Sequence, residues 1–342
     1  MDKVLVTGGA GFIGSHFVKR ILNAEEVTQV TVLDALTYAG HIENLGESFL
    51  NPKLTFVQGN VADTDLVDQL VRAHTDIVHF AAESHVDRSF FTAGTFLTTN
   101  VLGTQTLADA AMRHGIERFV HVSTDEVYGP LLEGAAAEDH PLRPTVPYAA
   151  SKAASDLVAL SYHRTYGVPV CVTRSSNNYG PYQHPEKIIP LFVTRLLRGQ
   201  PVTLHDRGQH VRNWLHVEDN CAAIELVLRG GVPGEVYNIG GGTDLTSRAL
   251  TDELLRICGA DWDAVTHIPD RRCNDLRYAM DWTKIAHQLG YQPTHDLGTG
   301  LVETVDWYRR NPDRWAPLAR NPYSPMPTVH TLATGQERAH VQ

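Results

Sequence analysis

Two acids stand side by side directly after a segment that is typical of a buried strand. Residues 118–122 read RFVHV, an apolar and β-branched run, and Ser123 and Thr124 lead from it to Asp125 and Glu126. Two close carboxylates repel each other, so one can be protonated while the other is ionised. The pattern favours a general acid and a general base that reach different atoms of one substrate, although a helix N-cap or a solvated loop also produces it.

A tyrosine and a lysine four residues apart follow this acid pair. The stretch YAASK places Tyr148 and Lys152 on the same face of a predicted helix. A lysine ammonium beside a phenol favours the phenolate, so we predict a lowered pKa for Tyr148 and a role in proton transfer. Such pairs are also common on helix surfaces.

A glycine-rich turn joins the first predicted strand to the first predicted helix. Gly9, Gly11 and Gly14 of TGGAGFIG match G-x-G-x-x-G, which lets the backbone approach a pyrophosphate at a helix N-terminus. Asp34 ends the second predicted strand, 20 residues after Gly14. An acid there binds an adenosine ribose and repels a 2′-phosphate, which favours NAD over NADP.

The elements that must position these residues alternate between strand and helix patterns. Helical patterns such as DTDLVDQLVRAH and GTQTLADAAMRHG separate the strand-like segments, which predicts an α/β fold with a doubly wound parallel (Rossmann) sheet. The strand-like segments are KVLVT, VTQVTVLDAL, LTFVQGNV, DIVHFAA, RFVHVST and PVCVTRSS.

The alternation stops near residue 180, where Pro- and Gly-rich turns and shorter strand signals begin. We therefore expect a dinucleotide-binding domain over residues 1–178 and a smaller α/β C-terminal substrate domain over 179–318. The segment 214–240 ends in EVYNIG, which we expect to return to the main sheet as one more strand. Residues 319–342 lack periodicity and are expected to be a loose tail.

The composition argues against several partners. The 342 residues are 42% hydrophobic and 20% charged, with a net charge of −10 and no run of Lys or Arg, which argues against nucleic acid and anionic membranes as main partners. No apolar stretch approaches the roughly 20 residues of a membrane span. The N-terminus begins directly with a strand pattern, so we expect no signal peptide and a cytoplasmic protein. The cysteines are far apart and match no metal motif, which predicts reduced thiols and no metal.

Together these motifs resemble the extended short-chain dehydrogenase/reductase family over residues 1 to about 310. The segments FAAESHVDRS, STDEVYG, NNYGPYQHPEKIIP and DLRYAMD are similar to those of the dTDP-glucose 4,6-dehydratases within it. TDEVYG discriminates best, because sugar-nucleotide epimerases of this fold share the Tyr and Lys but usually lack the acid pair.

The resemblance implies a hydro-lyase that keeps its NAD between turnovers. Tyr148 would take the proton of the sugar 4-hydroxyl while hydride passes to NAD, and Thr124 would hold the 4-oxygen. Glu126 would remove the proton on carbon 5, Asp125 would protonate the departing 6-hydroxyl, and hydride would return to carbon 6. The residue chemistry alone does not decide which of the two acids is the base.

The resemblance also implies ligand-binding residues. Those expected at the cofactor are Gly8, Gly11, Phe12, Ile13, Gly14, Asp34, Asn60, Val61, Ala81, Ala82, Thr99, Tyr148, Lys152 and Asn177. Those expected at the nucleotide-sugar substrate are Ser84, Thr124, Asn177, Glu186, Lys187, His205, Arg212, Asn238 and Arg277. Arg212 and Arg277 are the expected diphosphate ligands, since a guanidinium matches phosphate oxygens bidentately.

Three places depart from the family pattern. Asn60 stands where an Asp is usual, His205 stands where a Tyr usually packs on the nucleobase, and residues 272–274 replace a Pro/Lys–Gly–His stretch. The nucleotide therefore stays open between thymidine and uridine diphosphate. An epimerase or decarboxylase of the same fold and a non-catalytic NAD-binding scaffold are the alternative functions.

Two long predicted helices, over residues 94–115 and 148–167, carry apolar positions on more than one face. A helix that is apolar on several faces needs a second partner. Relatives with this fold pair such helices, so we predict a homodimer that is held by a four-helix bundle.

Overall fold

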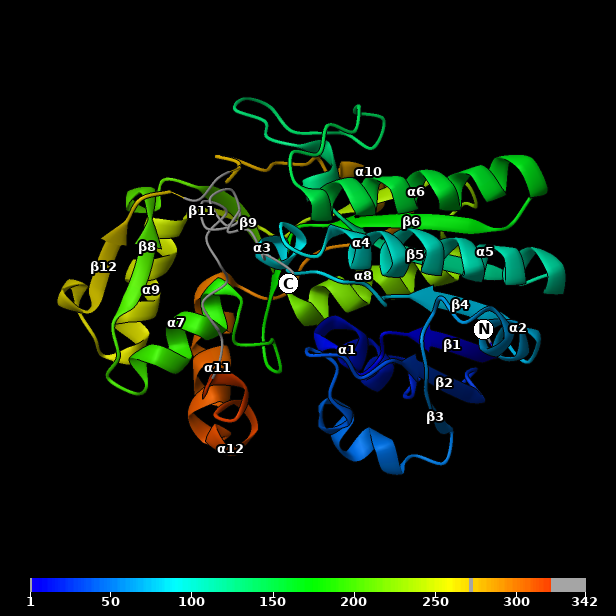
Figure 1. Cartoon of the computed structure of the whole chain (residues 1–342), viewed down its shortest axis with the longest axis horizontal. Coiled ribbons are helices and arrows are strands. Elements are labelled where there is room, and N and C mark those ends of the chain that lie inside the picture. The colour runs from blue at the N-terminus through cyan, green and yellow to red at the C-terminus, as the bar shows by residue number, and fades with distance from the viewer. Residues whose placement is uncertain (1, 271–272, 321–342) are drawn as a thin grey trace, which may run out of the picture.

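The computed structural model describes residues 2–270 and 273–320, which leaves Arg272 and residues 321–342 of the predicted tail outside the described residues. Within these ranges a larger lobe surrounds a parallel sheet and a smaller lobe lies beside it (Figure 1). The predicted doubly wound sheet is confirmed, with the strand order β10-β6-β5-β4-β1-β2-β3. Its strands are β1 (Lys3–Thr7), β2 (Gln29–Asp34), β3 (Leu54–Gln58), β4 (Asp76–His79), β5 (Arg118–Thr124), β6 (Val170–Ser175) and β10 (Val236–Ile239).

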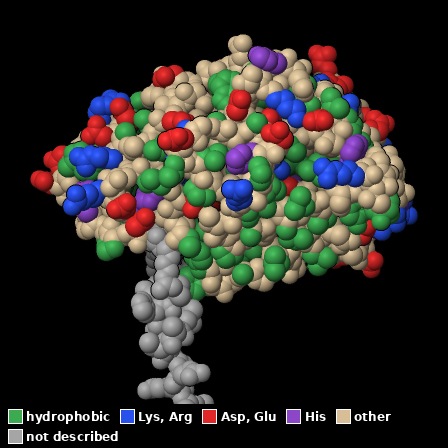
Figure 2. Space-filling view, turned by 90° about the horizontal axis from the view of Figure 1, so that it is seen from above, with side chains coloured by type: hydrophobic (Ala, Val, Ile, Leu, Met, Phe, Trp, Pro, Cys, Tyr) green, Lys and Arg blue, Asp and Glu red, His purple; other side chains and the backbone are tan. Residues whose placement is uncertain are grey.

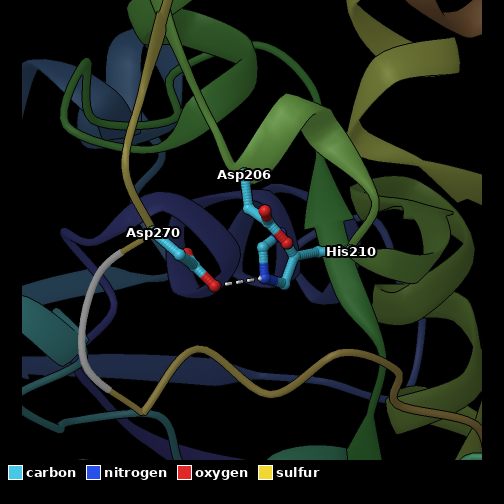
Figure 3. A group of neighbouring side chains, drawn as sticks. All are labelled: Asp206, His210 and Asp270. Carbon is cyan, nitrogen blue, oxygen red and sulfur yellow. Dashed lines mark hydrogen bonds and ion pairs between the residues drawn. The ribbon is translucent and has the colours of Figure 1, made fainter.

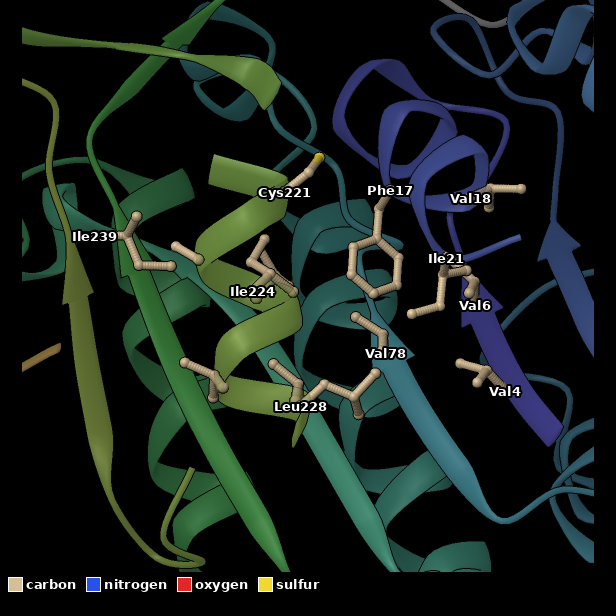
Figure 4. Packing of buried hydrophobic residues seen from close by; sticks show 14 of the residues in the cluster. Val4, Val6, Phe17, Val18, Ile21, Val78, Cys221, Ile224, Leu228 and Ile239 are labelled. Atoms are coloured by element: carbon tan, nitrogen blue, oxygen red, sulfur yellow. The ribbon is translucent and has the colours of Figure 1, made fainter. Parts of the chain in front are cut away.

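Helices cover both faces of this sheet because its strands are apolar on both sides. Helices α1 (Phe12–Ile21) and α8 (Val217–Gly230) pack on one face, and Figure 4 shows their apolar side chains pointing at the strands. The other face is covered by α2 (Thr64–Arg72), α5 (Gly103–His114) and α6 (Pro147–Tyr166). The sheet is therefore buried on both faces, and this packing holds the ends of its strands in place.

The register brings the carboxyl ends of the central strands to one edge. Thr7 of β1 pairs with His79 of β4, and Thr124 of β5 pairs with Ser175 of β6. The glycine turn, the segment after β4 and the acid pair all follow these strand ends. Ligands of doubly wound sheets bind at this edge, where the strand order reverses.

The smaller lobe is built from segments on both sides of α8 and β10. Strand β10 pairs in parallel with β6, so the chain returns to the main sheet between two excursions into the smaller lobe. Three strands, β7 (Asn177–Tyr179), β9 (Val211–His216) and β11 (Thr243–Thr246), form one sheet of the described part of this lobe. A parallel pair, β8 (Val202–His205) and β12 (Val265–Ile268), forms another.

Helices of the smaller lobe enclose a separate apolar core. They are α7 (Ile188–Leu196), α9 (Ser247–Cys258), α11 (Leu297–Arg310) and α12 (Pro312–Trp315), while α10 (Thr283–Leu289) packs beside β10. The remaining elements are short: η1 (Ile42–Leu50), α3 (Val86–Ser89), α4 (Ala93–Phe96), η2 (Leu97–Leu102), η3 (Asp125–Tyr128), η4 (Asp206–Gly208), η5 (Trp262–Ala264) and η6 (Leu318–Arg320). In the described part of the chain, every helix is too short or too polar to span a bilayer.

Candidate active site

The glycine turn after β1 leaves no room for side chains. Gly8 has a φ of 70°, and a Cβ atom placed on it would lie 2.5 Å from the backbone nitrogen of Ala81. A Cβ atom on Gly14 would lie 2.2 Å from the carbonyl oxygen of Gly8. The backbone can therefore approach a ligand closely at the N-terminus of α1, which begins at Phe12. This geometry fits a pyrophosphate.

Asp34 is held at the end of β2 by the backbone of this turn. Its carboxylate accepts hydrogen bonds from the backbone nitrogens of Ala10 and Leu36, both at 2.9 Å. Burial raises the pKa of Asp34, while these two bonds lower it. The Oδ1 atom of Asn60 accepts a bond from the nitrogen of Ala62 at 2.9 Å. Both side chains are thus fixed where an adenosine would lie.

A cavity of about 310 Å³ opens above this edge of the sheet. Every residue that the sequence predicted at the cofactor lines it: Gly8, Gly11, Phe12, Ile13, Gly14, Asp34, Asn60, Val61, Ala81, Ala82, Thr99, Tyr148, Lys152 and Asn177. A second cavity of about 230 Å³ shares Glu126, Asn177, Glu186 and Lys187 with the first and is also lined by His205 and Arg212. The cavities adjoin, so they can hold a dinucleotide and a second, smaller ligand end to end.

The acid pair lies where the cavities meet. Thr124 is the N-cap of η3, and its hydroxyl accepts a bond from the nitrogen of Glu126 at 3.3 Å. Glu126 lines both cavities, whereas Asp125 lines the first and is buried. Burial and the charge of Glu126 raise the pKa of Asp125 to about 7, against a smaller lowering by Arg212. Burial beside a second carboxylate thus favours the neutral form of Asp125 more than is usual for an aspartate.

Asp125→Asn is expected to stabilise the protein more at pH 8 than at pH 5. The folded pKa is about 7 and the ordinary value is 3.8, so ionised Asp125 costs stability increasingly as pH rises through this window and fully above it. The gain in unfolding free energy at pH 8 should exceed that at pH 5 by about 3 kcal/mol. Urea unfolding at both pH values measures the free energy of unfolding of the wild type and the variant. Glu117→Gln is the control, since Glu117 is exposed. An equal gain in stability at both pH values would contradict the argument that burial raises the pKa of Asp125.

Tyr148 and Lys152 lie on the first turns of α6 and face the cavity. The predicted lowering of the Tyr148 pKa is wrong for the protein alone. Burial raises this pKa, and the charges of Glu126 and Asp125 raise it further, against the hydrogen bond of Thr124, which lowers it. Lys152 donates instead to the carbonyl oxygen of Val122 at 2.7 Å, and burial lowers its own pKa to about 8.

A buried polar network beneath this helix was not predicted. The Nε atom of Arg174 donates to Asp156 at 2.9 Å, and its Nη1 donates to the hydroxyl of Tyr128 at 2.9 Å. Tyr128 in turn donates to Asn238 at 2.7 Å. Asp156 also raises the pKa of Lys152 against the effect of burial. Only the spacing of Asp156, four residues after Lys152, could have indicated it from the sequence.

Two predicted substrate residues lie away from the cavities. Asn238 is buried, and its amide nitrogen donates to the carbonyl oxygens of Ala136 and Asp281, both at 2.9 Å. Arg277 donates to the carbonyl oxygens of Leu131 and Gly134, at 2.9 and 2.8 Å. Both side chains thus bond to the loop that follows η3, and neither lines either of the two cavities.

The second cavity carries His205 and the described part of the segment 272–274, two of the three departures from the family pattern. His205, Cys273 and Asn274 line it, together with His210 and Tyr278, which the sequence did not single out as site residues. His210 bonds Asp270 at 3.0 Å, and Asp206 lies beside them (Figure 3). These three side chains could hold a metal ion, whereas the sequence predicted none. The bond between His210 and Asp270 itself explains why these two lie together.

Comparison with known proteins decides the family. Residues 5–304 match the family model described as GDP-mannose 4,6 dehydratase. A dTDP-glucose 4,6-dehydratase from Streptomyces niveus is 55% identical over 92% of this chain and 95% of its own length. The chain belongs to the dTDP-glucose 4,6-dehydratase family.

Solved structures of this family share the fold. DesIV, a dTDP-glucose 4,6-dehydratase from Streptomyces venezuelae that was solved with NAD bound, superposes with a TM-score of 0.91 at 54% identity, over 92% of this chain and 99% of its own. A UDP-glucose 4-epimerase from Thermotoga maritima also superposes, with a TM-score of 0.84 at 30% identity, over 90% of this chain and 99% of its own. The family's fold thus also occurs in epimerases, so the fold alone does not separate the two activities.

Proposed function

We propose that this chain converts dTDP-glucose to the 4-keto-6-deoxy sugar nucleotide with NAD as its cofactor. The acid pair carries the proposal: a buried Asp125 and a more accessible Glu126 lie beside Tyr148 and Lys152, where a dinucleotide cavity adjoins a second cavity. An epimerase needs no such pair. A UDP-linked glucose stays the alternative substrate, because His205 and Asn274 lie at the nucleobase end.

Each side chain has one task in this proposal. Bound NAD would supply a hydride acceptor at carbon 4 of the sugar and a hydride donor at carbon 6. Tyr148 takes the proton of the 4-hydroxyl, and the Thr124 hydroxyl, which lowers the pKa of Tyr148, holds the 4-oxygen. Glu126 removes the proton on carbon 5, which the 4-ketone has made acidic. Asp125, whose pKa near 7 keeps much of it protonated at neutral pH, protonates the departing 6-hydroxyl.

A nucleotide panel tests the reaction. Purified protein is incubated with dTDP-glucose or UDP-glucose, and the products are made alkaline, in which a 4-keto-6-deoxy sugar absorbs strongly in the ultraviolet. We expect the signal with dTDP-glucose at the higher kcat/KM. Epimerised sugar without ketone would favour the epimerase, and no turnover of any sugar nucleotide would favour the scaffold.

NAD is expected to copurify with the protein and to survive turnover. The close backbone approach at Gly8 and Gly14 and the fixed carboxylate of Asp34 provide a preformed site, and the reaction returns its hydride. Acid extraction of the protein before and after many turnovers should release the same amount of NAD. A requirement for one added NAD per product would contradict the proposed redox balance.

We also propose a homodimer through η2, α5 and α6. Figure 2, which views the molecule from the α6 side of Figure 1, shows hydrophobic side chains gathered along its lower right edge, where α5 and α6 lie. Leu102 and Leu157 of these helices are 47% and 59% exposed. A face of this kind favours pairing with a second copy.

Leu102→Glu and Leu157→Glu are each expected to convert the dimer to a monomer at micromolar concentration, because a buried charge opposes association. Light scattering measures the mass of each variant. Leu50→Glu is the control, since Leu50 is 83% exposed in η1, outside the proposed interface. A wild-type protein with the mass of one chain would contradict the proposal.

A cytoplasmic location is part of the proposal as well. Cys171, Cys221, Cys258 and Cys273 are free, which is usual in a reducing compartment. Fractionation of cells that express the tagged chain tests the location, and recovery outside the cytoplasmic fraction would contradict it.

A further inference from the structure

The guanidinium group of Arg212 lies over the ring of Tyr278. Its Cζ atom is 4.4 Å from the ring centroid, within the distance at which an aromatic face attracts a cation. Both side chains line the second cavity, and Tyr278 is buried. Arg212 also donates to the carbonyl oxygen of Val211 at 2.8 Å. The arginine is therefore held in one orientation at the cavity wall.

Backbone pairing fixes this contact. The nitrogen of Val211 donates to the carbonyl oxygen of Leu276 at 2.8 Å, and the nitrogen of Tyr278 donates to the carbonyl oxygen of Val211 at 3.4 Å. Val211 is the first residue of β9 and forms a parallel bridge with Arg277. This register places the ring of Tyr278 beside Arg212, which is the next residue of β9.

The hydroxyl of Tyr278 reaches toward the helix that carries Tyr148. It donates to Asp275 at 2.8 Å, and the hydroxyl of Thr145 donates to the same carboxylate oxygen at 2.5 Å. Thr145 directly precedes Val146, the N-cap of α6. One chain of contacts thus joins the arginine of the smaller lobe to the residue that precedes the N-cap of α6.

We propose that Tyr278 is a positioning residue, whose ring holds Arg212 toward the substrate diphosphate and whose hydroxyl aligns that end of the site with Tyr148. The inference rests on the proposed function, in which Arg212 binds the diphosphate. A free arginine loses much rotamer freedom when a ligand orders it, so an arginine that is already ordered binds the ligand more tightly.

Tyr278→Leu removes the ring and Tyr278→Phe removes only the hydroxyl. Calorimetric titration with dTDP and with thymidine separates the diphosphate contact from the nucleoside contact. We expect Tyr278→Leu to weaken dTDP about 10-fold and thymidine by less than about twofold. Tyr278→Phe should keep dTDP affinity within about twofold but lower kcat about 3- to 10-fold, since the hydroxyl link is lost.

A double-mutant cycle tests the link to Arg212. In an Arg212→Ala background, which should itself weaken dTDP, Tyr278→Leu is expected to have no further effect on dTDP affinity. An undiminished effect in that background, or equal weakening of thymidine, would overturn the positioning role. If the leucine variant does not fold, Tyr278→Met removes the ring with an unbranched, flexible side chain that adapts better to an irregular gap.

Different results would contradict the role of Arg212 as diphosphate ligand and the role of Tyr278 as positioning residue. Arg212→Ala with unchanged dTDP affinity would overturn both the diphosphate ligand and the positioning role. Weakened dTDP in Arg212→Ala but wild-type affinity in Tyr278→Leu would overturn the positioning role alone. Turnover of dTDP-glucose by the wild-type protein, measured in parallel, tests the proposed reaction independently of both.

Discussion

Tyr148→Phe is expected to lower turnover of dTDP-glucose by at least about 10³-fold, toward the upper end of what a general base contributes. The substitution removes only the hydroxyl, so the phenylalanine ring would fill the same space on α6. The variant would have no group to take the proton of the 4-hydroxyl. Formation of the alkaline-absorbing ketone measures the loss. The affinity for dTDP, measured by titration, should stay within about twofold because the nucleotide end is untouched.

Tyr166→Phe provides the matched control, since Tyr166 lies on the same helix but is 60% exposed. Its turnover should equal that of the wild type. If Tyr148→Phe kept more than about a tenth of wild-type turnover, another group would have to take the proton, and the task given to Tyr148 would be wrong.

Asp125→Asn and Glu126→Gln are each expected to lower turnover by about 10² to 10⁴-fold, the usual contribution of one general acid or base. Loss of Asp125 leaves the 6-hydroxyl without its proton donor, and loss of Glu126 leaves the proton on carbon 5 in place. In heavy water the wild-type product should carry deuterium at carbon 5, because the removed proton is replaced from solvent.

Incubation in heavy water also distinguishes the two variants. Recovered sugar from Asp125→Asn should still exchange at carbon 5, since Glu126 remains, whereas Glu126→Gln should show no exchange. The effect of Glu126→Gln has a second source, because the charge of Glu126 helps to raise the pKa of Asp125 and the two titrate as a pair. Glu117→Gln, at the opposite end of β5, is the control.

Wild-type turnover in both acid variants would show that the pair is only a polar helix start. Thr124 does cap η3, so this alternative has a structural basis. An epimerase would then be the better proposal, since the fold is shared with an epimerase.

Motifs of residues close together in the sequence correctly predicted the cofactor end of the site. The strand periodicity and the glycine spacing indicated where β1 ends and where Asp34 lies, and the structure brings the predicted cofactor residues to one cavity. These features depend on neighbours within about 20 residues. The edge of the sheet then follows from the rule that carboxyl ends of parallel strands meet.

Properties that depend on burial and on distant contacts could not be predicted in this way. The pKa of Tyr148 is raised because the folded chain buries it beside Glu126, and the sequence shows only its spacing from Lys152. Asn238 and Arg277 carry the right chemistry for a ligand, but their partners are the carbonyls of a loop about a hundred or more positions away. Asp125 is also buried more deeply than Glu126, a difference that the sequence does not show.

The return of β10 to the main sheet bears on how the chain can fold during synthesis. A ribosome would have to release residues through Ile239 before β6 gains its outer neighbour. Until then β6 presents an open row of backbone donors and acceptors, which can pair with another nascent chain. A fragment that stops at residue 178 would keep this open edge permanently. We therefore expect an expressed dinucleotide-binding fragment to aggregate unless it extends past β10.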